Sequence, residues 1–125
     1  MRPMKTILVV EDSPTVLQMI SDILTVKGYK VIEANNGLEA LELLRSNHID
    51  LVLVDLLMPL MNGVELIQAI RAEQIYMDIP IVMQTAQSHA SLQQEGMAAG
   101  ANGWIVKPFD PGQLVSSFDR FLKDS

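Results

Sequence analysis

Short apolar runs that favour strands alternate with helix-like segments along the whole chain. Two of these runs, 6–10 (TILVV) and 50–55 (DLVLVD), are almost wholly apolar and too short for a buried helix. Strands of this kind are typical of parallel sheets that are covered by helices on both faces. The alternation therefore predicts an α/β fold with a doubly wound, five-stranded parallel sheet.

Capping residues and glycines mark where the expected helices begin and end. Ser13 followed by Pro14 is typical of a helix start, and Gly28 of a helix end. Asn36 and Asn62, each followed by glycine, precede two more helices. Strands are expected over 6–10, 30–34, 50–55, 79–85 and 103–106, and the last two helices over 88–99 and 111–123. The helix faces expected to meet the sheet are Val16, Ile20, Ile23 and Val26 or Lys27, then Leu38, Ala40, Leu41 and Leu44, then Leu66, Ile67 and Ile70, and finally Leu114, Phe118, Phe121 and Leu122.

Composition narrows the classes of protein that fit. A chain of 125 residues with 49% hydrophobic residues suits one domain, expected over 1–125 with a core of about 5–123. The absence of cysteine excludes disulfide scaffolds and thiol nucleophiles. A formal charge of −6 argues against direct binding to nucleic acid. The longest apolar stretch, 49–61, is interrupted by charges and a proline, so we expect a cytoplasmic protein that does not enter a membrane.

Polar side chains follow four of the predicted strands. Glu11 and Asp12 follow the first strand, Asp55 ends the third, Thr85 ends the fourth and Lys107 follows the fifth. Sites in open parallel sheets form at the carboxyl ends of the strands. We therefore expect three carboxylates, one hydroxyl and one ammonium at a single edge of the sheet.

This set of groups fits the chemistry of phosphoryl transfer. Carboxylates from separate loops suit Mg²⁺, which prefers oxygen ligands and keeps several waters. An aspartate that attacks phosphorus forms an acyl phosphate, and Asp55 is the candidate nucleophile. Lys107 and Thr85 could bind the remaining phosphoryl oxygens, by charge and by a hydrogen bond.

Each residue also has an ordinary structural interpretation. Asp12 could simply cap the following helix, Thr85 could be a strand-end hydroxyl, and Lys107 a solvated loop lysine. Asp55 is harder to explain in this way, because a carboxylate among apolar neighbours needs a partner or a cation. The functional interpretation depends on all of these residues occurring together at one edge.

Four motifs make the chain resemble a known family. VVEDSP, VDLLMP with Asn62-Gly63 after it, QTA and KPF are similar to the motifs of response-regulator receiver domains in two-component signalling. The resemblance extends from Thr6 to about Leu122. It suggests a stand-alone, chemotaxis-like regulator, and the receiver of a longer protein is the alternative. It implies a flavodoxin-like (βα)5 fold with strand order 2-1-3-4-5.

The resemblance also implies roles for individual residues. Asp55 would be the phosphoacceptor, and a histidine kinase or histidine phosphotransfer protein would be the donor. Glu11, Asp12, Asp55 and the backbone carbonyl of Leu57 would bind Mg²⁺. Thr85 and Lys107 would contact the phosphoryl group.

Trp104 occupies the position of the family's switch aromatic. The resemblance implies that phosphorylation changes the pose of Trp104 and reshapes a protein-binding face formed by 88–99, 103–106 and 111–123. The peptide bond before Pro108 is a candidate cis peptide. The downstream partner is an unknown protein, and the chain is expected to be a monomer or a weak, phosphorylation-dependent dimer.

The chain departs from the family's pattern in three ways. Glu11 replaces the commoner Asp, Trp104 is larger than the usual Tyr or Phe, and Leu57 and Gln87 flank the acceptor where side chains tune access of water. We expect Leu57 to affect the lifetime of the phosphoryl group. Trp104 could instead be a half-buried packing residue.

Three rival functions fit the sequence less well. A receiver-like scaffold without phosphate chemistry is disfavoured by the full set of site residues. A phosphatase would need a second acid two residues after the nucleophile, where this chain has Leu57, so no enzyme with a separate substrate is expected. A nucleotide-binding module would need a glycine-rich phosphate loop, which the sequence lacks.

Overall fold

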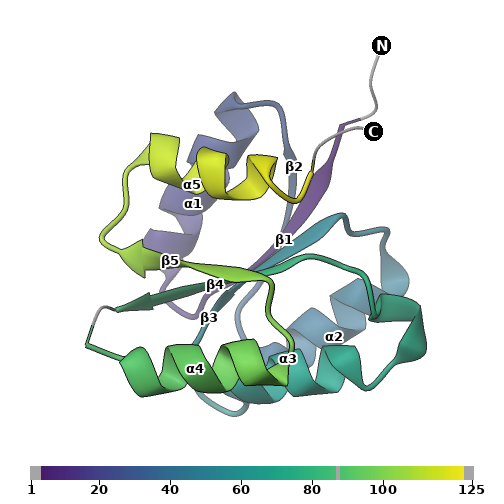
Figure 1. Ribbon diagram of the computed structural model, residues 1–125. Coiled ribbons are helices and arrows are strands. Elements are labelled where there is room, and N and C mark those ends of the chain that lie inside the picture. The colour runs from purple at the N-terminus through teal and green to yellow at the C-terminus, as the bar shows by residue number, and fades with distance from the viewer. Residues whose placement is uncertain (1–3, 87, 123–125) are drawn as a thin grey trace.

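A five-stranded parallel sheet runs through the centre of the molecule in the order β2-β1-β3-β4-β5 (Figure 1). The structure is a computed structural model and describes residues 4–86 and 88–122. The strands are β1 (Thr6–Val10), β2 (Lys30–Ala34), β3 (Leu51–Asp55), β4 (Ile81–Ala86) and β5 (Gly103–Lys107). The helices are α1 (Pro14–Val26), α2 (Gly37–Ser46), α3 (Gly63–Arg71), α4 (Ala90–Ala99) and α5 (Pro111–Asp119), with a short 3₁₀ helix, η1 (Gln74–Tyr76). The predicted fold class and strand order are confirmed.

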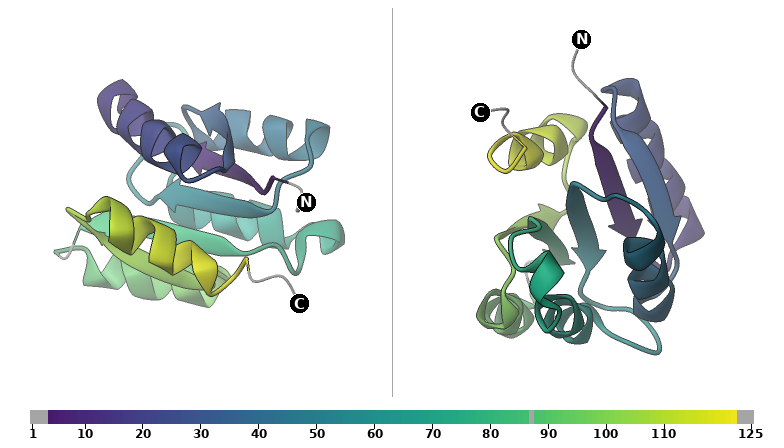
Figure 2. Two further views of the ribbon diagram at one scale, coloured as in Figure 1. Left: turned by 90° about the horizontal axis from the view of Figure 1, so that it is seen from above. Right: turned by 90° about the vertical axis from the view of Figure 1, so that its right-hand side faces the viewer.

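Helices cover both faces of the sheet, with α1 and α5 on one face and α2, α3 and α4 on the other (Figures 1 and 2). Each face has its own apolar core. The core under α1 and α5 contains Ile20 and Phe118, and the opposite core contains Leu66 and Ile67. Alternate residues of β1 and β3 point into the two cores, so both strands are fully buried, as their uniform apolar sequences predict.

Two predicted helix faces are wrong at their edges. In α1 the buried residues are Leu17, Ile20, Ser21 and Leu24, and Val26 is 84% exposed. In α2 the buried set is Gly37, Ala40, Leu41 and Leu44, and Leu38 is 53% exposed. Both buried sets follow the spacing i, i+3, i+4, i+7. Both helices also carry apolar residues beside the buried face. The sequence was therefore equally compatible with a buried face shifted by about one residue around the helix, which is the face that was predicted.

The bounds of most elements agree with the prediction, and the differences lie at element ends. The first residue expected in β3, Asp50, instead accepts a hydrogen bond from the Thr6 backbone N–H at 2.8 Å. The helix α5 ends at Asp119 rather than at Lys123, which lies outside the described residues. The sequence carried no clear signal for η1. Among the described residues, no helix is both long enough and apolar enough to cross a membrane.

The strand order reverses direction between β1 and β3, which is where this class of fold forms its sites. From β1 the chain passes to β2 on one side, and β3 then lies on the other side of β1. The carboxyl ends of β1 and β3 therefore lie beside one another, with the loops that follow them at the same edge. Those loops begin with the acidic residues singled out above.

Gly63 fixes the distance between α3 and the end of β3. A Cβ atom on Gly63 would lie 2.6 Å from the backbone oxygen of Asp55 and 2.7 Å from the Cα atom of Leu56. Because both are backbone atoms, neither can move aside by a side-chain rotation. The Gly63 N–H also donates to the Leu56 carbonyl at 3.0 Å. Only glycine allows α3 to approach the strand that carries Asp55 this closely.

We predict that Gly63→Ala lowers the free energy of unfolding by roughly 2–3 kcal/mol, because the added methyl group overpacks a backbone contact. Urea denaturation would measure this change. Gly112→Ala is the matched control, because Gly112 also lies in the first turn of a capped helix and its nearest contact is the Asp110 side chain at 3.3 Å. The control should stay within about 1 kcal/mol of wild type. Equal losses in the two variants would contradict the assigned contact.

Candidate functional site

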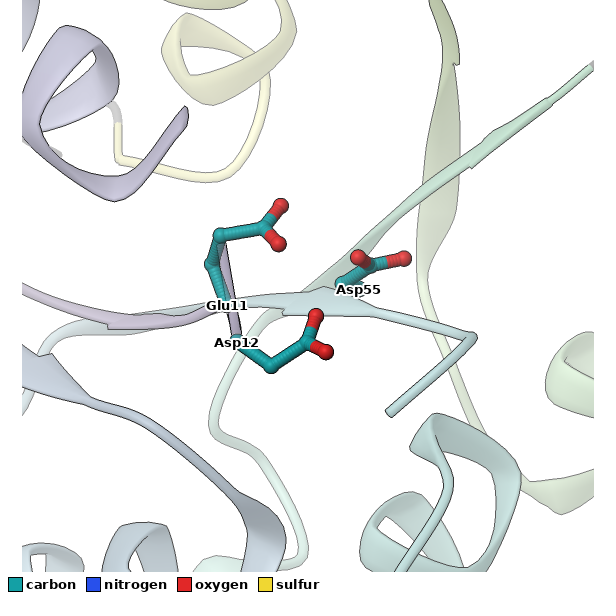
Figure 3. A group of neighbouring side chains, drawn as sticks. All are labelled: Glu11, Asp12 and Asp55. Carbon is teal, nitrogen blue, oxygen red and sulfur yellow. The ribbon is translucent and has the colours of Figure 1, made fainter. Parts of the chain in front are cut away.

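Three carboxylates meet where β1 and β3 end (Figure 3). Glu11 and Asp12 directly follow β1, and Asp55 is the last residue of β3. One carboxylate oxygen from each residue lies within 4.8 Å of the other two. Glu11 and Asp55 are buried, at 1% and 6% exposure, whereas Asp12 is exposed. The cluster therefore has two acids within the protein and one that faces solvent.

The start of α1 orients Glu11. The Ser13 backbone N–H donates to Glu11 Oε2 at 3.0 Å. Ser13 is the N-cap of α1, as predicted, and its hydroxyl accepts from the Val16 N–H at 3.4 Å. The alternative in which Asp12 caps this helix is therefore wrong. The Asp12 carboxylate joins the acidic cluster instead.

Asp55 is held by one backbone donor and one cation. Its Oδ1 accepts from the Leu57 N–H at 3.2 Å, and its Oδ2 accepts from Lys107 Nζ at 3.2 Å. Lys107 Nζ also lies 3.5 Å from Glu11 Oε1. Lys107 is therefore not a solvated lysine, because its ammonium pairs with both buried acids at the base of the cluster. The peptide bond between Lys107 and Pro108 is cis, as the resemblance implied.

The cluster carries more negative than positive charge. Burial, chiefly, and the neighbouring Asp55 raise the pKa of the Glu11 carboxyl above its usual value, while the Ser13 N–H and Lys107 act in the opposite direction. Three carboxylates share a single ammonium among the described residues of the cluster. An oxygen-only donor set with excess negative charge fits a hard divalent cation such as Mg²⁺.

The other predicted residues lie on the neighbouring strands. Thr85 is buried on β4, and its hydroxyl donates to the Ala86 carbonyl at 3.3 Å rather than to an acid of the cluster. Trp104 on β5 is 47% exposed and lines an open surface groove of about 610 Å³ between β5 and α5, together with Gln113 and Arg120. The Leu57 side chain is 51% exposed beside Asp55. Gln87 lies outside the described residues.

Gln84 is a site residue that the sequence analysis missed. Its side chain is fully buried on β4, and Nε2 donates to Glu11 Oε1 at 3.2 Å. The segment 79–85 was interpreted only as a buried strand ending in a hydroxyl. The available signal was an amide two residues after Val82, and therefore on the same face of a strand that is otherwise apolar up to Thr85.

Comparisons with known proteins agree with this geometry. Residues 7–119 match the family model described as a response regulator receiver domain. The chain is 40% identical to a chemotaxis protein CheY homologue of Campylobacter jejuni over 118 residues, which cover 93% of this chain and 91% of that protein. It is 34% identical to the phosphate regulon transcriptional regulatory protein PhoB of Pseudomonas aeruginosa over 119 residues, which cover 95% of this chain. The match spans about half of PhoB, 52% of its length.

Solved structures show the same fold. Chemotaxis protein CheY4 of Vibrio cholerae superposes with a TM-score of 0.91 at 39% identity, covering 96% of this chain and all of that one. The receiver domain of the sensor histidine kinase PA1611 from P. aeruginosa superposes with a TM-score of 0.90 at 27% identity, covering 98% of this chain and all of that one. That structure has a magnesium ion coordinated in its active site cleft. The chain described here belongs to the response-regulator receiver domains of two-component phosphorelay signalling.

Proposed function

We propose that Asp55 is the residue on which this receiver domain is phosphorylated. The observation that carries the proposal is the position of its carboxylate, which pairs with Lys107 through Oδ2 at 3.2 Å while oxygens of Glu11 and Asp12 lie within 4.8 Å. A nucleophilic carboxylate thus lies beside two acids that suit a cation and beside an ammonium that could bind phosphoryl oxygens. The phosphoryl donor would be a phosphohistidine on a kinase or a phosphotransfer protein.

Glu11, Asp12, Asp55 and the Leu57 backbone carbonyl would hold Mg²⁺. A bound Mg²⁺ supplies positive charge that offsets the charge on the phosphoryl oxygens during transfer. The magnesium ion in the PA1611 receiver domain supports this assignment. Glu11 keeps the charge of the commoner Asp, and its bonds to Ser13 and Gln84 fix the longer side chain within the cluster.

The transfer itself needs only one bond exchange. An oxygen of Asp55 attacks phosphorus, the bond between phosphorus and the donor histidine nitrogen breaks, and that nitrogen keeps the electron pair. Lys107 then pairs with the phosphoryl oxygens that replace the carboxylate charge. Because the domain transfers the group onto itself, we expect no separate substrate.

The output is proposed to run through Thr85 and Trp104. Thr85 is one strand away from Asp55, on β4, which is paired with both β3 and β5. A phosphoryl group would give the Thr85 hydroxyl a stronger acceptor than the Ala86 carbonyl. The resulting movement would change the face formed by α4, β5 and α5, where Trp104 borders an open surface groove.

The remaining assignments are also proposals. The 125 residues would act as one receiver domain that binds a downstream protein, without contacting nucleic acid or a membrane. It would be a monomer or a weak dimer that forms on phosphorylation. A cytoplasmic location, expected from the sequence, stays a prediction.

Trp104 fluorescence tests the proposed function. Because the chain has a single tryptophan, its emission reports this position alone. Adding beryllofluoride, which mimics a phosphoryl group, should change the emission of wild type only when Mg²⁺ is present. Asp55→Asn should show no such change. A wild-type protein that does not respond would count against the switch, and a response that persists in Asp55→Asn would count against Asp55 as its origin.

A further inference from the structure

Gln84 is a buried amide whose neighbours on the adjacent strands are a site residue and a core residue. The register pairs Gln84 with Asp55 on β3 and with Ile105 on β5. The next position inward on the same face is Val82, which belongs to the apolar core under α1 and α5. Gln84 therefore extends the polar row of Glu11 and Asp55 one strand further, at the point where the core ends.

Only half of the Gln84 amide is satisfied. Nε2 donates to Glu11 Oε1 at 3.2 Å, but Oε1 has no hydrogen-bond partner among the described residues, although it is buried. A buried polar atom without a partner costs stability. Gln84 lines an apolar groove of about 450 Å³ together with Val16, Met19 and Phe109. An apolar residue of similar size would fit these surroundings and would avoid the cost of the unpaired oxygen. Stability alone therefore does not explain an amide at this position. Its hydrogen bond to Glu11 is the contact that an apolar residue could not make.

Gln84 and Lys107 reach the same oxygen of Glu11. Lys107 Nζ lies 3.2 Å from Asp55 Oδ2 and 3.5 Å from Glu11 Oε1, and the second oxygen is the one that Gln84 binds. Without the Gln84 donor, Lys107 would be the only side-chain donor left to Glu11 Oε1 among the described residues. The ammonium would then move towards Glu11, away from Asp55.

We propose that Gln84 is a positioning residue of the cation site, which binds Glu11 Oε1 so that the Glu11 carboxylate stays available to the cation and Lys107 stays on Asp55. The inference rests on the proposed function. Partners of this kind, which orient a metal-binding carboxylate, commonly change metal affinity by roughly 10–100-fold when they are removed. Gln84→Met keeps the length of the side chain and removes both polar atoms.

The test measures Mg²⁺ affinity and metal-free stability in the same variant. For Gln84→Met, we expect the Mg²⁺ dissociation constant, measured by calorimetry, to rise by about tenfold. Its urea midpoint in EDTA should not fall, because the unpaired oxygen is gone. Ser21→Ala is the matched control, since the buried Ser21 hydroxyl donates to Glu33 away from the site. This control should keep the wild-type Mg²⁺ affinity.

A double-mutant cycle adds a readout that a purely structural role would not affect. In a Lys107→Met background, the effect of Gln84→Met on Mg²⁺ affinity should shrink to less than about threefold, because the competing ammonium is absent. Gln84→Leu would replace Gln84→Met if that variant did not fold. Unchanged Mg²⁺ affinity in the single variant, or an equal effect in both backgrounds, would overturn the inference and leave the proposed function standing. If wild type itself bound no Mg²⁺, the proposed function and this inference would both fail.

Discussion

Asp55→Asn should reduce phosphorylation by acetyl phosphate in the presence of Mg²⁺ to less than about one-thousandth of the wild-type rate. The amide is nearly isosteric with the carboxylate but is uncharged and a poor nucleophile. Its one oxygen can keep only one of the two hydrogen bonds, from the Leu57 N–H or from Lys107. The substitution also removes one of the three clustered negative charges, so the fold should survive. Intact-protein mass spectrometry would measure the fraction that carries a phosphoryl group over time.

Asp50→Asn is the matched control for this variant. Asp50 lies just before the opposite end of the same strand and accepts from the Thr6 N–H, a role that an asparagine oxygen can take over. The control should be phosphorylated at the wild-type rate. Phosphorylation of Asp55→Asn at a similar rate would mean that another residue accepts the group.

Lys107→Met should have opposite effects on stability and on Mg²⁺ binding. Removing the ammonium leaves Glu11, Asp12 and Asp55 without the cationic side chain that now pairs with two of them. We expect the free energy of unfolding in EDTA to fall by about 2 kcal/mol, a value reduced because the Lys107 side chain is 32% exposed. Because the lysine no longer competes for the carboxylates, Mg²⁺ should bind at least about fivefold more tightly. The Trp104 response to beryllofluoride should be lost.

Denaturation with and without Mg²⁺ would measure both effects in one series. Lys30→Met, at the exposed first residue of the outer strand β2, removes the same charge at the opposite end of the strands from the cluster. It should change Mg²⁺ affinity by less than about twofold, because solvent and salt screen distant surface charges. Weaker Mg²⁺ binding in Lys107→Met would contradict the view that the lysine and the cation compete for the same oxygens.

The fold and the position of the site were predictable for one physical reason. Strands as apolar as β1 and β3 fit inside a sheet that is covered on both faces. The helix expected between successive strands carries the chain back across the sheet, which makes neighbouring strands parallel. Once the strands are parallel, their carboxyl ends share an edge, so Asp12 and Asp55 come together although 43 positions separate them in the chain. The strand topology alone therefore brings the acids together, whatever the orientation of their side chains.

Contacts that depend on side-chain reach were not predictable in this way. The Gln84 bond to Glu11 spans two strand intervals, and only the register of β3 and β4 reveals it. Arg71 is a similar case, because its guanidinium joins the Gly100 carbonyl, the Tyr76 carbonyl and the Asn102 side chain. The sequence showed Arg71 only as the end of a helix. In the same way, Leu38 was assigned inward because apolar character alone does not choose between two adjacent helix faces.

The most direct measurement of the central claim is to locate the phosphoryl group. Wild-type protein would be incubated with Mg²⁺ and acetyl phosphate, reduced with borohydride, which converts an aspartyl phosphate to homoserine, and digested for peptide sequencing by mass spectrometry. We predict homoserine at position 55, dependent on Mg²⁺ and absent from Asp55→Asn. Homoserine at another position, or none in wild type under conditions that label a receiver domain of known activity, would contradict Asp55 as the phosphoacceptor.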